Sequence, residues 1–452
     1  MRLSDIAGPD VAEIVREDPA ALGEGLSAFH PAEISELLQG LPREDRVRVL
    51  MHLDDETLGN TLAYADGETL KLALTRLTPQ RLAAALDILE PDDAASVLSI
   101  VPEEKRSPIL DAMTTRESAA ARGLLRFDPG TAGRLMTDRF VSVTPHHTVT
   151  AALEELRHID RRVATVANLY VVRENGHLVG VVSLRTLLPA DGNATIGSLM
   201  IDEVVSVTPE TPQEEVARLV SRYSFSALPV VDDTGRILGI VTVDDVIDVL
   251  VSKETESMLR MGGVAAEDSE TRGTFDYFGG SILRIVRSRI GWLMLLFLAG
   301  TLTGSVLRHF EGQLSSVVAL SIFIPLIIGT GGNAGSQSVS TIIRALALGQ
   351  VRLRDAGRVL LRESMAGLLL GLALCIFAVI RTMLWGNTPR LALVVGLTIL
   401  CVCAWANIVG ALVPLLAQRL NIDPTVSSAP LITTLVDATG LAIYMLIARA
   451  IL

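Results

Sequence analysis

The sequence predicts a multidomain chain: an all-α superhelical N-terminal domain, an α/β tandem repeat and a polytopic α-helical membrane domain with five spans. Three observations predict it: short amphipathic patterns before residue 131, an internal repeat up to residue 250, and five long apolar runs after residue 279. With 452 residues, the chain is too long for one ordinary domain. We expect its parts at 1–130, 131–195, 196–250, 246–278 (a connecting helix) and 279–452.

The N-terminal region repeats apolar residues at helical spacing in segments such as EISELLQGL and RLAAALDIL. The breaks LPRED, LTPQ, EPDD and VPEE interrupt this pattern about every dozen residues. Short antiparallel helices of this kind stack into a superhelix or bundle. We therefore predict an all-helical domain over residues 1–130.

The middle of the chain is a tandem repeat. MTDRFVSVTPHHTVTAALEELRHI from Met136 is echoed by MIDEVVSVTPETPQEEVARLVSRY from Met200, and LYVVRENGHLVGVVSLRTL from Leu169 by LPVVDDTGRILGIVTVDDV from Leu228. Each copy reads as helix, strand, turn, strand and helix. Because both halves recur in order, the segment resembles a pair of CBS domains.

Five apolar runs follow, each near the length that crosses a ~30 Å hydrocarbon layer. We place them at about 290–308, 315–343, 364–385, 391–416 and 429–450. Nine arginines lie near the span ends on one side and four on the other, which predicts a cytoplasmic N-terminal part and an outside C-terminus. The membrane is then an inner or plasma membrane of a bacterium.

Charge is divided unevenly between the two halves. From Tyr277 onward there are 13 Arg, no Lys and five acids, a formal charge of +8, so residues 1–276 carry −20 of the total −12. An acidic surface of this strength repels nucleic acid and attracts cations. The soluble part is therefore not expected to bind nucleic acid.

One carboxylate, Asp437, lies within the fifth apolar run. A charged acid at the centre of a spanning helix costs about 2.5–3.5 kcal/mol on insertion scales. No Lys or Arg precedes Arg449 in this run, and the centres of the other runs contain none. Asp437 is either a hydrogen-bonded structural acid or a cation site on a watery path, and the second is the default for an intramembrane acid.

The second apolar run contains PLIIGTGGNAGSQS from Pro325, with four glycines that weaken a helix. Such backbone is tolerated at membrane depth where it is buried in protein or lines a water-filled cavity. Asn333 and Gln337 lie at i,i+4, with Gly329 one turn earlier on the same face. Close helix packing accounts for some of the glycines but not for the two amides. Amide and carboxylate oxygens suit Mg²⁺ or Ca²⁺.

This motif, the fifth-run motif PLITTLVDATGLAIY from Pro430 and the domain order are similar to the MgtE family of Mg²⁺ channels and transporters, over essentially the whole chain. The resemblance implies a homodimer with one pore on its two-fold axis, in which Asp437 of each subunit holds a largely hydrated Mg²⁺. One departure is Ala429, where the family pattern has Asn. The resemblance also implies that backbone and amide oxygens around Asn333 assist. The residues that we predict for the ion pathway are Asp437, Asn333, Gly329, Gly332, Gln337 and Thr433.

The resemblance also implies that cytosolic Mg²⁺ binds between the helical domain, the CBS pair and the connecting helix and closes the pore. Taken singly, each acidic residue that the resemblance offers as a ligand for this cytosolic Mg²⁺ can equally be a solvated surface charge. Asp423, near the fourth and fifth runs, is most simply an N-cap with Pro424 in the first helical position. The candidate regulatory ligands are Glu90, Asp92, Asp93, Asp232, Asp244, Asp245, Asp248, Glu254 and Glu256.

Gly239, Thr242 and Asp245 in the second copy fit a pattern that binds adenosine nucleotides such as ATP in many CBS pairs, whereas the first copy has Thr186 in place of the acid. A plain strand-to-helix turn with an N-cap explains the same residues.

The sequence thus predicts a Mg²⁺-selective channel or transporter for uptake. The alternatives are a transporter of another divalent cation (Mn²⁺, Co²⁺ or Ca²⁺) and a membrane-anchored nucleotide sensor, which requires no polar residue in the spans. The sequence has no Walker, GxSxG or HExxH motif, so no enzyme is expected.

Overall fold

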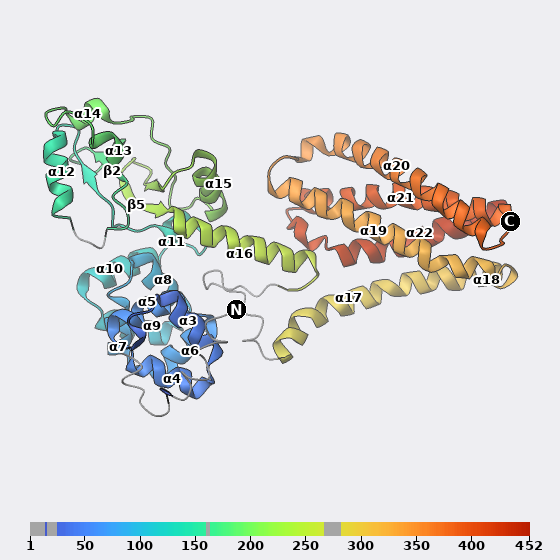
Figure 1. The fold of residues 1–452 in the computed structure, drawn as a ribbon, viewed down its shortest axis with the longest axis horizontal. Helices are drawn as coiled ribbons and strands as arrows, with labels where there is room; N and C mark the ends of the chain where they lie inside the picture. The colour runs from blue at the N-terminus through green and yellow to red at the C-terminus, as the bar shows by residue number, and fades with distance from the viewer. Residues whose placement is uncertain (1–13, 16–24, 160–162, 266–281) are drawn as a thin grey trace. The chain divides into compact units, whose positions relative to one another are not determined.

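The computed structural model describes residues 14–15, 25–159, 163–265 and 282–452 (Figure 1). The chain divides into two compact units, Met1–Lys253 with Asp268–Gly279, and Glu254–Glu267 with Gly280–Leu452. The first contains the helical and repeat regions, and the second contains the long apolar helices. Parts of the predicted N-terminal domain (1–13 and 16–24) and of the predicted connecting segment (266–278) lie outside the described residues.

The described part of the N-terminal region is all-helical, as predicted. Pro31, Pro79 and Pro91 lie in the first turns of three helices, where the missing N–H would have no intrahelical partner. The side chains of Asp66 and Thr78 accept hydrogen bonds from the first turns of two helices. The helices are α3 (Pro31–Gly40), α4 (Arg43–His52), α5 (Asp55–Ala63), α6 (Gly67–Arg76), α7 (Pro79–Leu86), α8 (Pro91–Ser99), α9 (Glu103–Ala112) and α10 (Thr115–Leu124).

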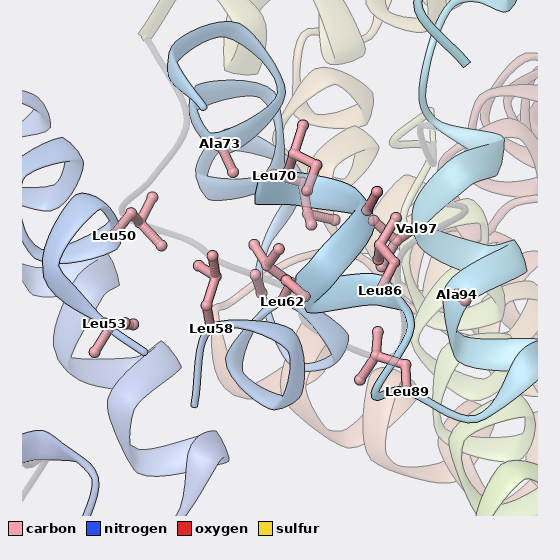
Figure 2. Close-up of a cluster of buried hydrophobic side chains, with 14 of the residues drawn as sticks. Leu50, Leu53, Leu58, Leu62, Leu70, Ala73, Leu86, Leu89, Ala94 and Val97 are labelled. Carbon is pink, nitrogen blue, oxygen red and sulfur yellow. The ribbon is translucent and has the colours of Figure 1, made fainter. Parts of the chain in front are cut away.

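These helices stack in an alternating order: α3 on α5, α5 on α7, α7 on α9, and α8 on α10. Figure 2 shows leucines and alanines of successive helices, among them Leu62 and Leu86, gathered in one buried cluster. Gly59 is required where α5 meets α7, because a Cβ there would collide with the carbonyl oxygen of Ala85. The predicted superhelical stacking therefore follows from small residues and leucines at helical spacing.

The repeat forms two α/β copies, which confirms the predicted CBS pair. Within each copy a hairpin turns at a glycine with positive φ, Gly176 (80°) and Gly235 (79°). β1 lies parallel to β2, and β2 pairs antiparallel with β3, as β4 does with β5. The elements are α11 (Ala132–Leu135), β1 (Ser142–Val143), α12 (Val149–Arg157), β2 (Asn168–Val172), β3 (Leu178–Ser183), α13 (Leu184–Leu187), α14 (Ile196–Leu199), α15 (Gln213–Tyr223), β4 (Ala227–Val231), β5 (Ile237–Thr242) and α16 (Val243–Met261).

The two copies exchange segments. Thr137, at the start of the first copy, exchanges backbone hydrogen bonds with Ile240 on β5 of the second. Ile201, at the matching place of the second copy, exchanges them with Val181 on β3 of the first. We call these two pairings the crossed bridges. Each copy therefore supplies a piece of its partner's sheet.

Two glycines permit the crossed bridges. A Cβ at Gly239 would lie 2.7 Å from the Thr137 carbonyl oxygen and against Met136, and a Cβ at Gly180 would lie 2.6 Å from the Met200 sulfur. Both contacts are closer than a side chain allows, so each glycine is needed for the approach of the other copy.

Among its described residues, the second unit contains five helices long and apolar enough to cross a membrane, in agreement with the predicted number. The third of them begins at Ala356, earlier than the predicted 364. α21 packs against α19, α20 and α22, and α17 packs on α22. The elements are α17 (Ile282–His309), α18 (Glu311–Ser316), α19 (Ala319–Ala347), η1 (Leu353–Asp355), α20 (Ala356–Leu384), α21 (Pro389–Arg419), η2 (Pro424–Val426) and α22 (Ala429–Ile451).

The helix α19 runs without interruption through Pro325 and its four glycines, so their weakening effect does not break it. Packing explains the continuity in part. Gly331 and Gly335 face Val436 and Ile432 of α22, at distances that leave no room for a larger residue. Small residues let helix backbones approach closely where lipid supplies no hydrophobic driving force.

Candidate functional site

The intramembrane carboxylate lies where α22 faces α19. Ser428 precedes α22 as its N-cap residue and Pro430 lies in its first turn, so that Asp437 comes in the third turn. The Asp437 side chain is half-buried. Its Oδ1 atom is buried and accepts no hydrogen bond from the residues that the structure describes. A buried carboxylate oxygen without a donor is costly. The arrangement therefore suits a cation or an ordered water at this oxygen.

The register between α19 and α22 defines the surroundings of this carboxylate. The two helices run antiparallel: the Tyr444 hydroxyl donates to the Leu320 carbonyl over 3.0 Å, and Ser336 and Thr433 hydroxyls lie 3.2 Å apart. Between these two contacts, Asp437 is at the level of the α19 turn that contains Gly329. Thr433 lies one turn before Asp437 on the same face of α22.

Three predicted pathway residues form an exposed line on α19. Gly329, Asn333 and Gln337 are each exposed in the single chain and follow one another at i,i+4 spacing. A Cβ at Gly329 would meet no atom within 4 Å. We call these residues, with Thr433 and Asp437 on α22, the polar face. Its amides and carboxylate are oxygen donors of the kind that Mg²⁺ prefers.

Gly332 has a different position from the rest of the predicted set. It is buried, and an added Cβ would lie 2.8 Å from the Thr433 methyl group. The glycine is therefore explained by the close packing of α19 on α22. The sequence pattern could not separate Gly332 from Gly329, because periodicity does not tell which side of a helix meets its neighbour.

The polar face holds one carboxylate per chain. In the described part of the chain, no group of three His, Cys, Asp or Glu side chains could hold a metal ion. A single carboxylate with a few neutral oxygens fits a Mg²⁺ that keeps most of its waters, since this ion dehydrates reluctantly. These residues do not provide enough oxygen ligands to coordinate a fully dehydrated Mg²⁺.

The predicted regulatory acids have varied surroundings. Asp92 is buried and Asp93 lies next to it in the first turn of α8, which follows Glu90. Asp244 is exposed and Asp248 half-buried on α16. The role of these acids in Mg²⁺ sensing stays a prediction.

Asp232 has a structural task. Its Oδ1 accepts hydrogen bonds from the Thr234 hydroxyl and from the backbone N–H groups of Thr234 and Arg236, all at 2.7–2.9 Å. The bond from the Thr234 hydroxyl, followed by that from the Arg236 backbone, lowers the pKa of Asp232 below its ordinary value. These bonds close the turn between β4 and β5.

Two acids of the connecting helix pair with arginines. Glu254 Oε1 lies 3.3 Å from Nη1 of Arg344, and Glu256 Oε1 lies 2.5 Å from Nη2 of Arg260. Arg260 Nη1 in turn lies 2.6 Å from Asp423 Oδ2. Arginine side chains therefore already neutralise Glu254 and Glu256, two of the carboxylates that were predicted to bind a divalent cation.

Asp423 caps η2, as predicted, by accepting from the Thr425 N–H over 2.9 Å. Burial by itself would raise the pKa of Asp423. The hydrogen bonds from Thr425 and the ion pair with Arg260 outweigh that effect and lower the pKa. Pairing with Arg260 lay beyond sequence reasoning, because the two residues are 163 positions apart.

The predicted nucleotide residues are explained by the fold. Gly239 makes room for a crossed bridge, and the Thr242 hydroxyl donates to Asp245 Oδ2 over 2.6 Å where β5 passes into α16. Thr242 and Asp245 are both buried. The simpler interpretation, a strand-to-helix turn, therefore suffices for all three.

A buried ion pair between the helical region and the repeat was not predicted. Nη2 of Arg139 lies 3.0 Å from Glu117 Oε2 on α10 and also donates to the Leu89 carbonyl. Arg134 donates to the carbonyls of Leu124 and Ala95. No local pattern in the sequence marks this junction.

Comparison with protein families gives three matches along the chain. Residues 324–447 match the family described as "Divalent cation transporter", MgtE. Residues 29–130 match the MgtE intracellular N domain, and 132–192 and 196–252 match the CBS domain.

Similar proteins include the magnesium transporter MgtE of Thermus thermophilus, 43% identical over 76% of this chain and 74% of that protein. The magnesium transporter MgtE of Enterococcus faecalis is 36% identical over 74% and 72%. Among solved structures, the soluble part of a magnesium transporter is 30% identical, with a TM-score of 0.50, and covers 55% of this chain and 99% of that one.

Proposed function

Since this chain belongs to the MgtE family of divalent cation transporters, we propose that it carries Mg²⁺ across a membrane through the polar face. The observation that carries the proposal is the buried Oδ1 of Asp437, which has no donor among the described residues. A Mg²⁺ ion that arrives with its water shell supplies both positive charge and hydrogen-bond donors to that oxygen. The ion is the transported substrate and needs no permanent ligand cage.

We place two copies of the polar face around one path. One chain offers a single carboxylate and an exposed row of amides, which gives a divalent ion one negative charge. A second chain related by a two-fold axis would supply the other charge from the same residues. The homodimer is thus the simplest way to complete the site.

For regulation, we propose that Mg²⁺ on the cytoplasmic side binds the acidic faces of the first unit and of α16. Support comes from the charge of −20 on residues 1–276 and from acids such as Asp92, Asp93 and Asp244. Asp232, Glu254 and Glu256 have less support, because protein groups already occupy their oxygens.

Two further parts of the proposal concern orientation and nucleotide. The arginine excess places the first unit in the cytoplasm, with the C-terminus of α22 outside. ATP remains a candidate ligand of the second CBS copy. It has less support than Mg²⁺, because Gly239, Thr242 and Asp245 have structural tasks.

A different divalent cation would use the same oxygens, so competition between Mg²⁺, Mn²⁺, Co²⁺ and Ca²⁺ in flux measurements decides selectivity. A membrane-anchored nucleotide sensor requires no polar residue in its spans. The exposed amides of Asn333 and Gln337 on α19 and the carboxylate of Asp437 on α22 therefore favour transport.

The test is Mg²⁺ influx into proteoliposomes that contain a Mg²⁺-sensitive dye, with wild type, Asp437→Ala and Glu311→Gln. Glu311 is an exposed acid outside the polar face and serves as the matched control. We expect flux from wild type and the control and none from Asp437→Ala at equal oligomeric state. Equal flux from all three would remove Asp437 from the ion path. No flux from wild type at low internal Mg²⁺ would favour the sensor.

A further inference from the structure

Glu363 is a carboxylate in the third apolar helix that the polar face does not include. It lies about two turns after the start of α20 and is half-buried, and it makes no ion pair with a residue that the structure describes. An acid in a spanning helix is expensive, so its presence needs a reason. Its Oε2 atom accepts a hydrogen bond from the Ser338 hydroxyl of α19 over 2.9 Å. The acid is therefore a directional contact between two spans.

Ser338 lies where three spans meet. Its side chain is buried, and its hydroxyl oxygen is also 3.1 Å from the Asn407 carbonyl oxygen of α21. A Cβ at Gly410 of α21 would lie 2.7 Å from the Gly335 carbonyl oxygen and 3.1 Å from the Ser338 hydroxyl oxygen. The backbones of α19 and α21 are therefore in contact at this level, and Glu363 joins α20 to the same point.

A second hydroxyl holds the opposite side of the same turn of α19. The hydroxyl oxygens of Ser336 and Thr433 of α22 lie 3.2 Å apart. Since the Thr433 hydroxyl donates to the Ala429 carbonyl over 3.0 Å, it accepts from Ser336. Successive residues of a helix are rotated by ~100°, so Ser336 and Ser338 point to opposite sides of Gln337, the residue between them.

Gln337 is the member of the polar face whose direction depends on these two anchors. Its side chain is exposed, and within the described chain its amide makes no hydrogen bond. The direction in which this side chain leaves the helix is therefore set by the rotation of α19 about its axis. The four glycines of α19 let its neighbours approach closely but offer them no side chain to interlock with. Directional hydrogen bonds on either side of Gln337 supply what the glycines lack.

We propose that Glu363 is a positioning residue of the ion pathway. By accepting from Ser338 it fixes the rotation of α19, and it thereby holds the Gln337 amide toward the path of the hydrated ion. The amide oxygen accepts a hydrogen bond from a water in the shell of the ion, and Glu363 itself does not contact the ion. The inference rests on the proposed function, because it requires Gln337 to lie beside the path.

Two substitutions of Glu363 separate positioning from an effect of charge. Glu363→Gln keeps an oxygen that can accept from Ser338 and removes the negative charge. Glu363→Leu removes both the acceptor and the charge. Positioning therefore predicts that Glu363→Gln retains the affinity for the ion and that Glu363→Leu loses it. An electrostatic action of the carboxylate on the ion predicts an equal loss in both.

The test is Mg²⁺ influx into proteoliposomes as a function of external Mg²⁺, at equal amounts of folded protein. The variants are Glu363→Gln, Glu363→Leu and Ser338→Ala, with Ser364→Ala as the matched control. The Ser364 hydroxyl donates to the Leu360 carbonyl of its own helix over 2.7 Å. We expect the half-saturating Mg²⁺ concentration to rise about fivefold in Glu363→Leu and Ser338→Ala, which is the effect of one lost hydrogen bond. Glu363→Gln and the control should match wild type.

A double variant supplies a measurement that a purely structural role would not change. Gln337→Ala should raise the half-saturating concentration about fivefold, and adding Glu363→Leu should raise it no further, because Glu363 acts through that amide. Independent effects would instead multiply to about 25-fold and would refute the proposal.

Other results would also overturn it. These are an unchanged half-saturating concentration in Glu363→Leu and Ser338→Ala, or an equal loss in Glu363→Gln and Glu363→Leu. If Glu363→Leu is not monodisperse, Ser338→Ala and Glu363→Gln decide by the same criteria. Saturable flux from wild type with unchanged variants would remove this inference alone, whereas no flux from wild type would remove the proposed function together with it.

Discussion

The buried pair Arg139–Glu117 leads to a test of how the helical region is attached to the CBS pair. Both side chains are less than a tenth exposed, and their closest atoms lie 3.0 Å apart. Removing one partner leaves the other charge in a dry environment with incomplete compensation, which costs about 3–5 kcal/mol. Replacing both by apolar residues of similar volume removes that penalty. We therefore expect Glu117→Leu alone to destabilise more than Glu117→Leu combined with Arg139→Met.

The assay is urea unfolding of a fragment that ends at Lys253, with circular dichroism as the signal that monitors unfolding. With a denaturant slope of about 2 kcal/mol per M, a loss of about 4 kcal/mol lowers the urea midpoint by about 2 M. The double variant should recover part of this shift. Arg122→Gln is the matched control, because its ion pair with Asp111 is exposed and such pairs contribute about 0–1 kcal/mol.

A loss of less than about 1 kcal/mol for Glu117→Leu would refute the reasoning. The pair would then be exposed to water, and the Arg139–Glu117 contact would not hold the helical region against the CBS pair in solution. A double variant as unstable as the single one would instead show that the hydrogen bond of Arg139 to the Leu89 carbonyl carries the effect.

Three further predictions concern single contacts. Gly332→Ala should destabilise the membrane unit by about 1–3 kcal/mol through overpacking, whereas Gly329→Ala should not; melting temperatures in detergent compare them, and equal values would contradict the packing role. Since the pKa of Asp423 is lowered, the stability from its pair with Arg260 is fully present above pH 3.8 and is lost as the pH falls through the lower folded value. The melting difference between wild type and Arg260→Gln should thus stay constant from pH 5 to 8, and a decrease within that range would exclude the pair. Asp232→Ala should loosen the β4–β5 turn. The Mg²⁺ concentration that protects the first unit from protease should stay the same in this variant. If protection required more Mg²⁺, Asp232 would be a ligand of the regulatory Mg²⁺.

Much of the fold followed from patterns that are local in the sequence. Helix breaks at Pro79, Pro91 and Pro102, the repeat of both halves of the CBS copies and five long apolar runs each have a short-range physical cause. Pairings between distant segments have none. Arg139 with Glu117 and Arg260 with Asp423 depend on how separate elements within one unit pack, and no spacing in the sequence encodes that.

The candidate site was predictable in its chemistry and less so in its geometry. Asp437 stands out because a carboxylate is expensive in an apolar run. Which glycines of α19 face the exposed side and which meet α22 depends on the packing angle, so Gly329 and Gly332 could not be told apart. The partner of Glu254 was likewise hidden, because Arg344 lies 90 positions away and only the fold brings the two together. The partner of Glu256 was not hidden, because Arg260 follows it at i,i+4 on the same helix.

The crossed bridges have a consequence for how the two CBS copies depend on each other. One copy alone would leave its strand edge at Val181 open, and only the segment around Ile201 from another copy covers it. A free single copy would therefore have to meet a second molecule. Joining the two in one chain turns that encounter into an intramolecular step at a high effective concentration. An insertion between the copies is therefore tolerated only while both segments still reach across.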